Sequence, residues 1–418
     1  MMRIKERFFG WGAISHSILS FILVNFFAAN SLNIAFPAIA ELRGFDYSNL
    51  LYFNTIGGFV GILVTLISRA AIQKVGVKLV IFVGALISGI AFILMPLCTS
   101  QSVCGLLVII NAFTVVMYNS TTAFTLIGNW FPRKKGFVLG LVTGAGAISA
   151  LVLLPIFSNL NDSVGIVKAM LCFGVLQIAF AVSTLFWIKN TPAEAGLYPD
   201  NMPMTAEEEA RFVGQTGEKS PWSVTRVLKN KRFLLYSIGW GLSATCLIGI
   251  MTSAMPIMLS KGASQATVLA VVSSSGIIGF AGSTLSGVTD TKFGTVNTSV
   301  VTLALQALGA LIMGIAGQGQ VALMLAGYVA LVSVSQTSNN LLSSQLITVA
   351  GARHFNAVFG VAWAIIYGLR ALGSTICGWS LSNFGDYTPA LYIFVALSVL
   401  ALILVRLVGT EPEPVPED

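Results

Sequence analysis

Long apolar runs separated by short loops dominate this sequence. Each run covers the roughly 20 residues that a helix needs to cross a bilayer, and a lipid-exposed backbone must satisfy its hydrogen bonds internally. The pattern therefore predicts an all-α, polytopic membrane protein with twelve transmembrane helices. The predicted spans are 13–36, 49–71, 79–97, 103–127, 136–158, 165–188, 232–256, 265–288, 296–316, 321–347, 355–382 and 388–409.

Composition and loop charges agree with this class. Hydrophobic residues make up 56% of the chain and charged residues 9%, against about 25% charged in soluble domains. The net charge of +7 sits largely in short loops, where it orients helices and indicates no nucleic-acid partner. Because basic residues cluster in alternate loops, we predict a multi-pass plasma-membrane or inner-membrane protein with both termini in the cytoplasm.

The chain shows no pattern that indicates an enzyme, a metal or a cofactor. Its five cysteines lack metal-ligand spacing, and cysteines in membrane helices mostly pack as small apolar residues. No nucleophile–base pairing or phosphate-binding loop is present in the sequence. We therefore expect no catalytic residues, no metal site and no cofactor.

One long polar segment divides the chain. We predict an N-terminal six-helix bundle over 1–188, a cytoplasmic linker over 189–231 and a C-terminal six-helix bundle over 232–410. The tail, 411–418, is acidic and proline-rich, a composition typical of disorder. The bilayer is the surrounding partner, and we expect a monomer.

The two predicted bundles repeat each other. With a shift of 220 residues Asn119 aligns with Asn339 and Gly140 with Gly360, and with a shift of 218 Gly76 aligns with Gly294. These matches fall at corresponding helix ends. Two parallel six-helix repeats predict a substrate site near the membrane midplane.

The basic turn after the second span and its counterpart after the eighth carry a family resemblance. They read Gln73-Lys-Val-Gly-Val-Lys78 and Asp290-Thr-Lys-Phe-Gly294. With the six-plus-six plan, these turns resemble the major facilitator superfamily. The resemblance implies that superfamily's fold and alternating-access transport.

Three further stretches resemble the monocarboxylate and oxalate/formate branch of that superfamily. They are Ser31-Leu-Asn-Ile-Ala-Phe-Pro37, Asn129-Trp-Phe-Pro-Arg-Lys-Lys-Gly136 and Thr191-Pro-Ala-Glu-Ala-Gly-Leu-Tyr-Pro199. The branch implies a small organic anion as substrate. Many members carry an arginine in span 8, whereas span 8 of this chain, 265–288, has no charged residue.

Arg370, near the middle of span 11, is the leading candidate for substrate binding. A charge at mid-membrane costs about 2.5–3.5 kcal/mol on insertion scales and usually faces a cavity or a partner. No aspartate or glutamate lies inside any predicted span, so a mobile carboxylate is a natural counter-ion. The alternative is that Arg370 bonds helix-end carbonyls or extends its head group towards water.

Other polar or aromatic side chains at mid-span complete the predicted site. They line either a cavity or a helix–helix interface, because interhelical hydrogen bonds also explain polar stripes. Two of them, the aromatic neighbours of Arg370, either stack on the substrate or pack. These candidates are Tyr367, Trp363, Tyr118, Gln336, Asn339 and Asn33.

Charged residues at the cytoplasmic helix ends form a second predicted group. Basic residues there fix the topology, and we expect them to pair at a cytoplasmic gate. The group comprises Arg133, Lys134, Lys74, Asp290 and Arg353.

One mid-membrane cation suggests one substrate charge, so a monocarboxylate is expected. We expect transport to proceed as antiport or to be linked to a proton, and His16 is the candidate proton-carrying group within the spans. A multidrug exporter of the same superfamily is the main alternative, although span 5 lacks the Gly-Pro-x-x-Gly-Gly pattern. A transporter-like sensor is a further one, although 189–231 is short for a signalling domain.

Overall fold

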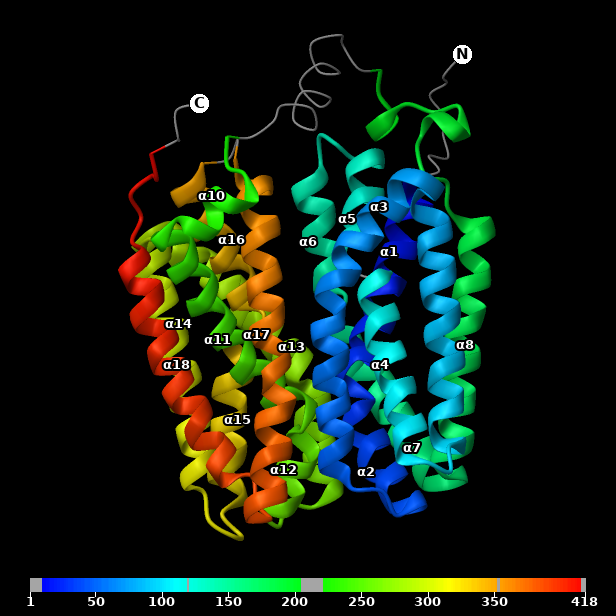
Figure 1. Cartoon of the computed structure of the whole chain (residues 1–418), viewed down its shortest axis with the longest axis vertical. Helices are drawn as coiled ribbons and strands as arrows, with labels where there is room; N and C mark the ends of the chain where they lie inside the picture. Colours follow the sequence, from blue (N-terminus) through cyan, green and yellow to red (C-terminus); the bar gives the residue numbers. More distant parts are fainter. Residues whose placement is uncertain (1–9, 119, 204–220, 352–353, 415–418) are drawn as a thin grey trace. The chain divides into compact units, whose positions relative to one another are not determined.

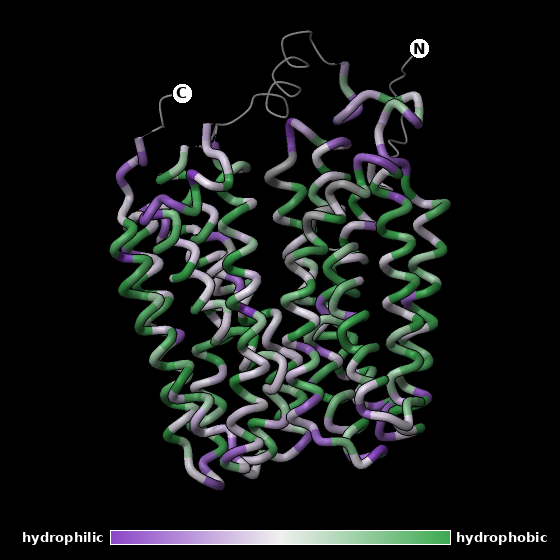
Figure 2. The backbone as a smooth tube through the Cα atoms, viewed as in Figure 1, coloured by the Kyte–Doolittle hydropathy of each residue, from purple (hydrophilic) through white to green (hydrophobic). Residues whose placement is uncertain are grey.

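The computed structural model describes residues 10–118, 120–203, 221–351 and 354–414, and its regular elements are helices (Figure 1). Hydrophobic residues run along the long helices, and hydrophilic ones gather towards their ends (Figure 2). Within these described residues, eleven helices are long and apolar enough to cross a membrane. The all-α polytopic prediction is confirmed.

The chain forms two compact units. Unit 1 comprises Met1–Phe45 and Val60–Glu218, and unit 2 comprises Asp46–Phe59 and Lys219–Asp418. One helix, α3 (Tyr47–Leu94), therefore begins in unit 2 and continues in unit 1.

Unit 1 contains the remaining helices of the N-terminal half. They are α1 (Gly10–Asn25), the π-helix η1 (Phe26–Asn30), α2 (Leu32–Arg43), η2 (Met95–Leu97), α4 (Gln101–Met117), α5 (Ser120–Trp130), α6 (Lys135–Gly144), the π-helix η3 (Ser149–Leu153), α7 (Leu154–Val164), α8 (Ile166–Trp187), η4 (Ala193–Ala195) and η5 (Pro199–Asn201).

Unit 2 contains the helices of the C-terminal half. They are α10 (Val224–Lys229), α11 (Lys231–Thr252), α12 (Ala254–Ser260), α13 (Gln265–Phe293), α14 (Thr295–Ile315), α15 (Val321–Ser335), α16 (Thr337–Ala350), α17 (Phe355–Phe384) and α18 (Thr388–Val408).

Helix α3 contains two predicted spans, 49–71 and 79–97, joined at a sharp turn. Gly76 has φ 83° and ψ 164° there, a backbone conformation that strongly favours glycine. The turn recurs at Gly294 between α13 and α14, with φ 84° and ψ 155°. The two aligned glycines thus occupy the same conformation, 218 residues apart.

Helix interruptions also recur in corresponding spans. The fourth span breaks between α4 and α5, where Tyr118 ends α4, and the tenth breaks at Gln336 between α15 and α16. The first span is interrupted by η1 and the seventh by Ser253, between α11 and α12. Interrupted spanning helices are typical of transporters, because a broken helix exposes backbone groups at membrane depth.

In unit 2, α17 packs against α11 through glycine. A Cβ at Gly373 would lie 2.4 Å from Thr245 O and 2.6 Å from Gly249 N. The Thr245 hydroxyl also donates a hydrogen bond of 2.8 Å to Leu369 O. Glycine at such a contact lets two backbones approach closely, and this contact fixes the rotation of α17 about its axis.

The C-terminal segment returns to the helix ends of unit 2. Arg232, at the start of α11, pairs with Glu413 at 2.9 Å and donates to Val408 O and Glu411 O. The Glu413 amide in turn donates to Val349 O at 2.8 Å. The predicted disordered tail is therefore held at Glu413, and 415–418 lie outside the described residues.

Candidate functional site

Arg370 lies near the middle of α17, fifteen residues from its first residue. At 1.5 Å per residue this is about 22 Å along the helix. Its side chain is half-buried, and its guanidinium carbon lies 5.3 Å from the centre of the Tyr367 ring. Among the described residues, the guanidinium makes no ion pair and no hydrogen bond.

The residues that follow Arg370 on α17 are covered by the first part of α3. Asn54 donates to the Ser374 hydroxyl at 3.1 Å, and Thr375 donates to the Thr55 hydroxyl at 2.8 Å. Within unit 2, Arg370 therefore stands at the end of this hydrogen-bonded stretch of α17.

The structure places the predicted aromatic neighbours beside Arg370. The rings of Trp363 and Tyr367 lie 6.4 Å apart, and both side chains are half-buried. These contacts join Trp363, Tyr367 and Arg370 into one group on α17. We call this group the candidate site.

Two other candidates lie at the break in the tenth span. Gln336 links α15 to α16 and packs against Gly279 of α13, and its amide makes no hydrogen bond among the described residues. Asn339 lies in the first turn of α16, and its side chain is outside the described part of the structure.

The candidates in unit 1 are enclosed by protein. Tyr118 is fully buried; its carbonyl accepts a hydrogen bond of 3.3 Å from Ser20, and its hydroxyl lies beside Ser88 and Gln177. Asn33 is 2% exposed and donates to Ala29 O at 3.2 Å. Both side chains pack between helices here, and their role in binding stays a prediction.

The predicted gating residues of unit 1 lie at helix ends. Arg133 donates from its backbone to Asp200 at 2.9 Å and from its guanidinium to Pro203 O at 3.0 Å. Lys134 and Lys74 are exposed. Arg133 thus fixes the segment that follows α8, and its part in a gate stays a prediction.

Asp290 joins three helices of unit 2. One carboxylate oxygen accepts from Thr295 at 2.6 Å, and the other accepts from Ser344 at 2.9 Å. These bonds connect the end of α13 to α14 and α16. Arg353 lies outside the described residues.

Asn190, which no sequence pattern indicates, supports the turn at Gly76. Its side-chain oxygen accepts from Lys78 N at 2.9 Å, and its carbonyl accepts from Asn129 at 3.0 Å. A cavity of about 340 Å³ lies beside this turn, with Asn190, Asn129 and Glu194 in its lining. The Asn190 atoms leave no room for a Cβ at residue 76.

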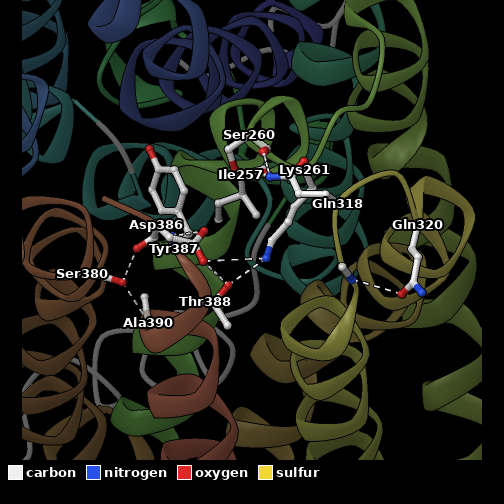
Figure 3. Close-up of polar contacts among 11 residues, drawn as sticks. Ile257, Ser260, Lys261, Gln318, Gln320, Ser380, Asp386, Tyr387, Thr388 and Ala390 are labelled. Carbon is white, nitrogen blue, oxygen red and sulfur yellow. Dashed lines mark hydrogen bonds and ion pairs between the residues drawn. The ribbon is translucent and has the colours of Figure 1, made fainter. Parts of the chain in front are cut away.

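Lys261, Asp386 and Thr388 form a polar cluster that no sequence pattern indicates (Figure 3). Lys261 donates to Thr388 at 2.7 Å and lies 3.8 Å from Asp386, whose carboxylate also accepts from the Thr388 hydroxyl. Burial opposes ionisation of Asp386, but the Thr388 hydroxyl, the Tyr387 N–H and Lys261 outweigh it, and its pKa lies below the usual value.

Membrane-length helices, recurrent helix breaks and a mid-span cation define a class, the polytopic membrane transporters. The chain belongs to the Major Facilitator Superfamily, whose sequence profile matches residues 18–374. The superfamily prediction is thereby confirmed, and the protein is a transporter and not an enzyme.

Two known proteins illustrate the similarity. The MFS-type transporter pynF of Aspergillus niger is 21% identical over 208 residues, which cover 48% of this chain and 43% of that protein. The match thus spans less than half the length of this curated relative. The crystal structure of a D-xylose-proton symporter superposes with a TM-score of 0.73, covering 97% of this chain and 99% of that chain at 15% identity. At this identity the likeness shows the fold alone.

Proposed function

We propose that the protein is a secondary transporter of a small organic anion, a monocarboxylate, which it moves by alternating access. The observation that carries this proposal is the guanidinium of Arg370 at the middle of α17, which makes no ion pair or hydrogen bond with the described residues. The short stretches that resemble the monocarboxylate and oxalate/formate branch support it. We further propose that both termini face the cytoplasm of a plasma-membrane or inner-membrane protein.

The charge of Arg370 favours an anionic substrate. At mid-membrane it costs about 2.5–3.5 kcal/mol, and a cation–π contact with one ring returns roughly 0.5–1 kcal/mol at an exposed site. The guanidinium fork remains available to bind a carboxylate through two parallel hydrogen bonds. A bound carboxylate therefore offsets a cost that the described protein groups leave uncompensated.

His16 favours exchange over proton symport. Its Nε2 lies 2.8 Å from the Thr184 hydroxyl, which itself donates to Phe180 O at 3.0 Å. Because that hydroxyl's proton is engaged, the hydroxyl accepts a hydrogen bond from Nε2–H. The ring is fully buried and stacks on Phe180 at 4.7 Å, so His16 is enclosed in the helix packing of unit 1.

Counterflow into proteoliposomes tests the proposal. Liposomes loaded with unlabelled propanoate are diluted into labelled propanoate, lactate, formate or oxalate, and uptake is compared for wild type, Arg370→Gln and Arg370→Lys. We expect wild type to take up a monocarboxylate, Arg370→Gln to lose at least about tenfold in uptake rate, and Arg370→Lys to retain part of it.

Arg406→Gln is the matched control, because Arg406 is an exposed arginine in the last turn of α18. It should leave uptake unchanged. Uptake of a cationic dye without uptake of any acid would move the function to a drug exporter. Full acid uptake by Arg370→Gln would refute the role of Arg370.

A further inference from the structure

Four aromatic side chains form a continuous series on α17 that ends at Arg370. Phe355, Phe359, Trp363 and Tyr367 are spaced by four residues, and successive ring centres lie 5.0, 5.3 and 6.4 Å apart. The first two pairs are stacked, with interplanar angles of 23° and 22°. We call these four residues the aromatic ladder.

The ladder is distinct from the face that seats α17 in the bundle. That face carries Val358, Ala362 and Ile366, which are 0%, 0% and 3% exposed and belong to the main hydrophobic core of unit 2. Phe355, Phe359 and Trp363 lie at the margin of this core, and all four ladder side chains stay half-buried. Their exposed ring surface is therefore available for a ligand.

The two ends of the ladder differ in chemistry. At one end, Tyr367 contacts the Arg370 guanidinium, and Ser374 beyond it is 2% exposed and bonded to Asn54. The other end reaches the first residue of α17. A ligand on this face therefore meets the Arg370 cation and the buried hydrogen-bonded Ser374 at one end, and aromatic ring surface at the other.

From this arrangement we infer that the substrate is an arylalkanoate, a monocarboxylate whose acid group is joined to a planar apolar ring. The carboxylate binds Arg370, and the ring stacks on Trp363 and Tyr367. Trp363 and Arg370 are seven positions apart, about 10 Å along a helix, a length that matches a phenyl ring with a short acid side chain. This inference names the substrate class of the proposed transport function and rests on it.

Paired substrates test the inference. Uptake of labelled propanoate and of 3-phenylpropanoate, which differ by one phenyl ring, is measured in proteoliposomes at several concentrations. We expect wild type to show at least about a fivefold lower KM for 3-phenylpropanoate. Trp363→Leu should lose this preference, so that the ratio of the two KM values falls to about one, and Trp363→Phe should restore most of it.

Trp379→Leu is the control, because Trp379 lies on the same helix, is 41% exposed and pairs with Phe384 outside the ladder. It should keep the wild-type preference. Equal KM values for the two acids in wild type would overturn the inference and leave the proposed transport of monocarboxylates standing. An equal rise of both KM values in Trp363→Leu and Trp363→Phe would overturn it as well. Uptake of neither acid by wild type would overturn the inference, and the absence of lactate, formate and oxalate uptake as well would refute the proposed function.

Discussion

Removing the Glu413 side chain should measurably destabilise unit 2. Its carboxylate accepts from Arg232 at 2.9 Å and from Asn230 at 2.6 Å, and the two charged side chains are 26% and 15% exposed. Hydrogen bonds to charged groups contribute roughly 1.5–3 kcal/mol when buried, whereas exposed ion pairs contribute about 0.2–1 kcal/mol. For this half-buried pair we expect Glu413→Ala to cost about 2 kcal/mol.

Glu411→Ala is the matched control. Glu411 is exposed and meets Arg232 through its backbone carbonyl, which alanine retains, so both variants change the net charge equally. Its cost should stay within about 0.5 kcal/mol, as for most surface substitutions.

The measurement is thermal unfolding of the purified protein in detergent at low and at 0.5 M salt. With roughly 2–4 °C per kcal/mol for a unit of about 200 residues, Glu413→Ala should lower Tm by about 4 °C or more. High salt should reduce this difference without abolishing it, because a partly buried pair is screened less than an exposed one. Equal Tm values for Glu413→Ala and Glu411→Ala would refute this account of the C-terminal segment.

Two further predictions concern packing and charge in unit 2. Gly373→Ala should destabilise the protein by about 1–3 kcal/mol, because the new methyl group meets Thr245 O. Gly360→Ala is the control and should not destabilise it, because a Cβ at residue 360 meets nothing within 4 Å. The Tm values of the two variants in detergent are compared, and equal values would contradict the close packing at Gly373. The Asp386→Asn variant should lose less stability on acidification than wild type. Because the pKa of Asp386 is lowered in the folded protein, the stabilising interaction of its carboxylate is fully present above the ordinary pKa of 3.8 and is lost as pH falls through the lower folded-state pKa. Melting curves from pH 5 to 3 test this, and parallel curves for wild type and variant would exclude it.

Hydropathy predicted the spanning helices because a membrane imposes one rule on every residue that crosses it. The paired turns at Gly76 and Gly294 were also accessible, since a positive φ strongly favours glycine and the sequence around them repeats. These signals are local or periodic. They therefore appear without knowledge of which helices meet.

The candidate site was predictable in part. Arg370 is conspicuous in an apolar run, and its aromatic neighbours follow from helical spacing. Tyr118 and Asn33 show the limit of this reasoning, because a polar residue in a spanning helix faces either a cavity or another helix and hydropathy does not distinguish the two. The structure buries both in unit 1.

Contacts distant in sequence were not predictable. Lys261 and Asp386 are 125 positions apart in loops, where charges carry no periodicity that pairs them. Asn190 and Glu413 likewise act through partners that only the folded chain brings near.

The glycine contact between α11 and α17 has a consequence for how such a transporter diversifies. Because Gly373 and the buried face formed by Val358, Ala362 and Ile366 hold the helix, the half-buried positions Phe359, Trp363 and Tyr367 contribute less to its placement. In the proposed substrate site, mutations at these positions change the surface offered to the substrate while the bundle keeps its geometry. Selection acting on that proposed site would therefore retune preference among related acids through single substitutions, and a library randomised at these three positions is a compact starting point for engineering new specificity.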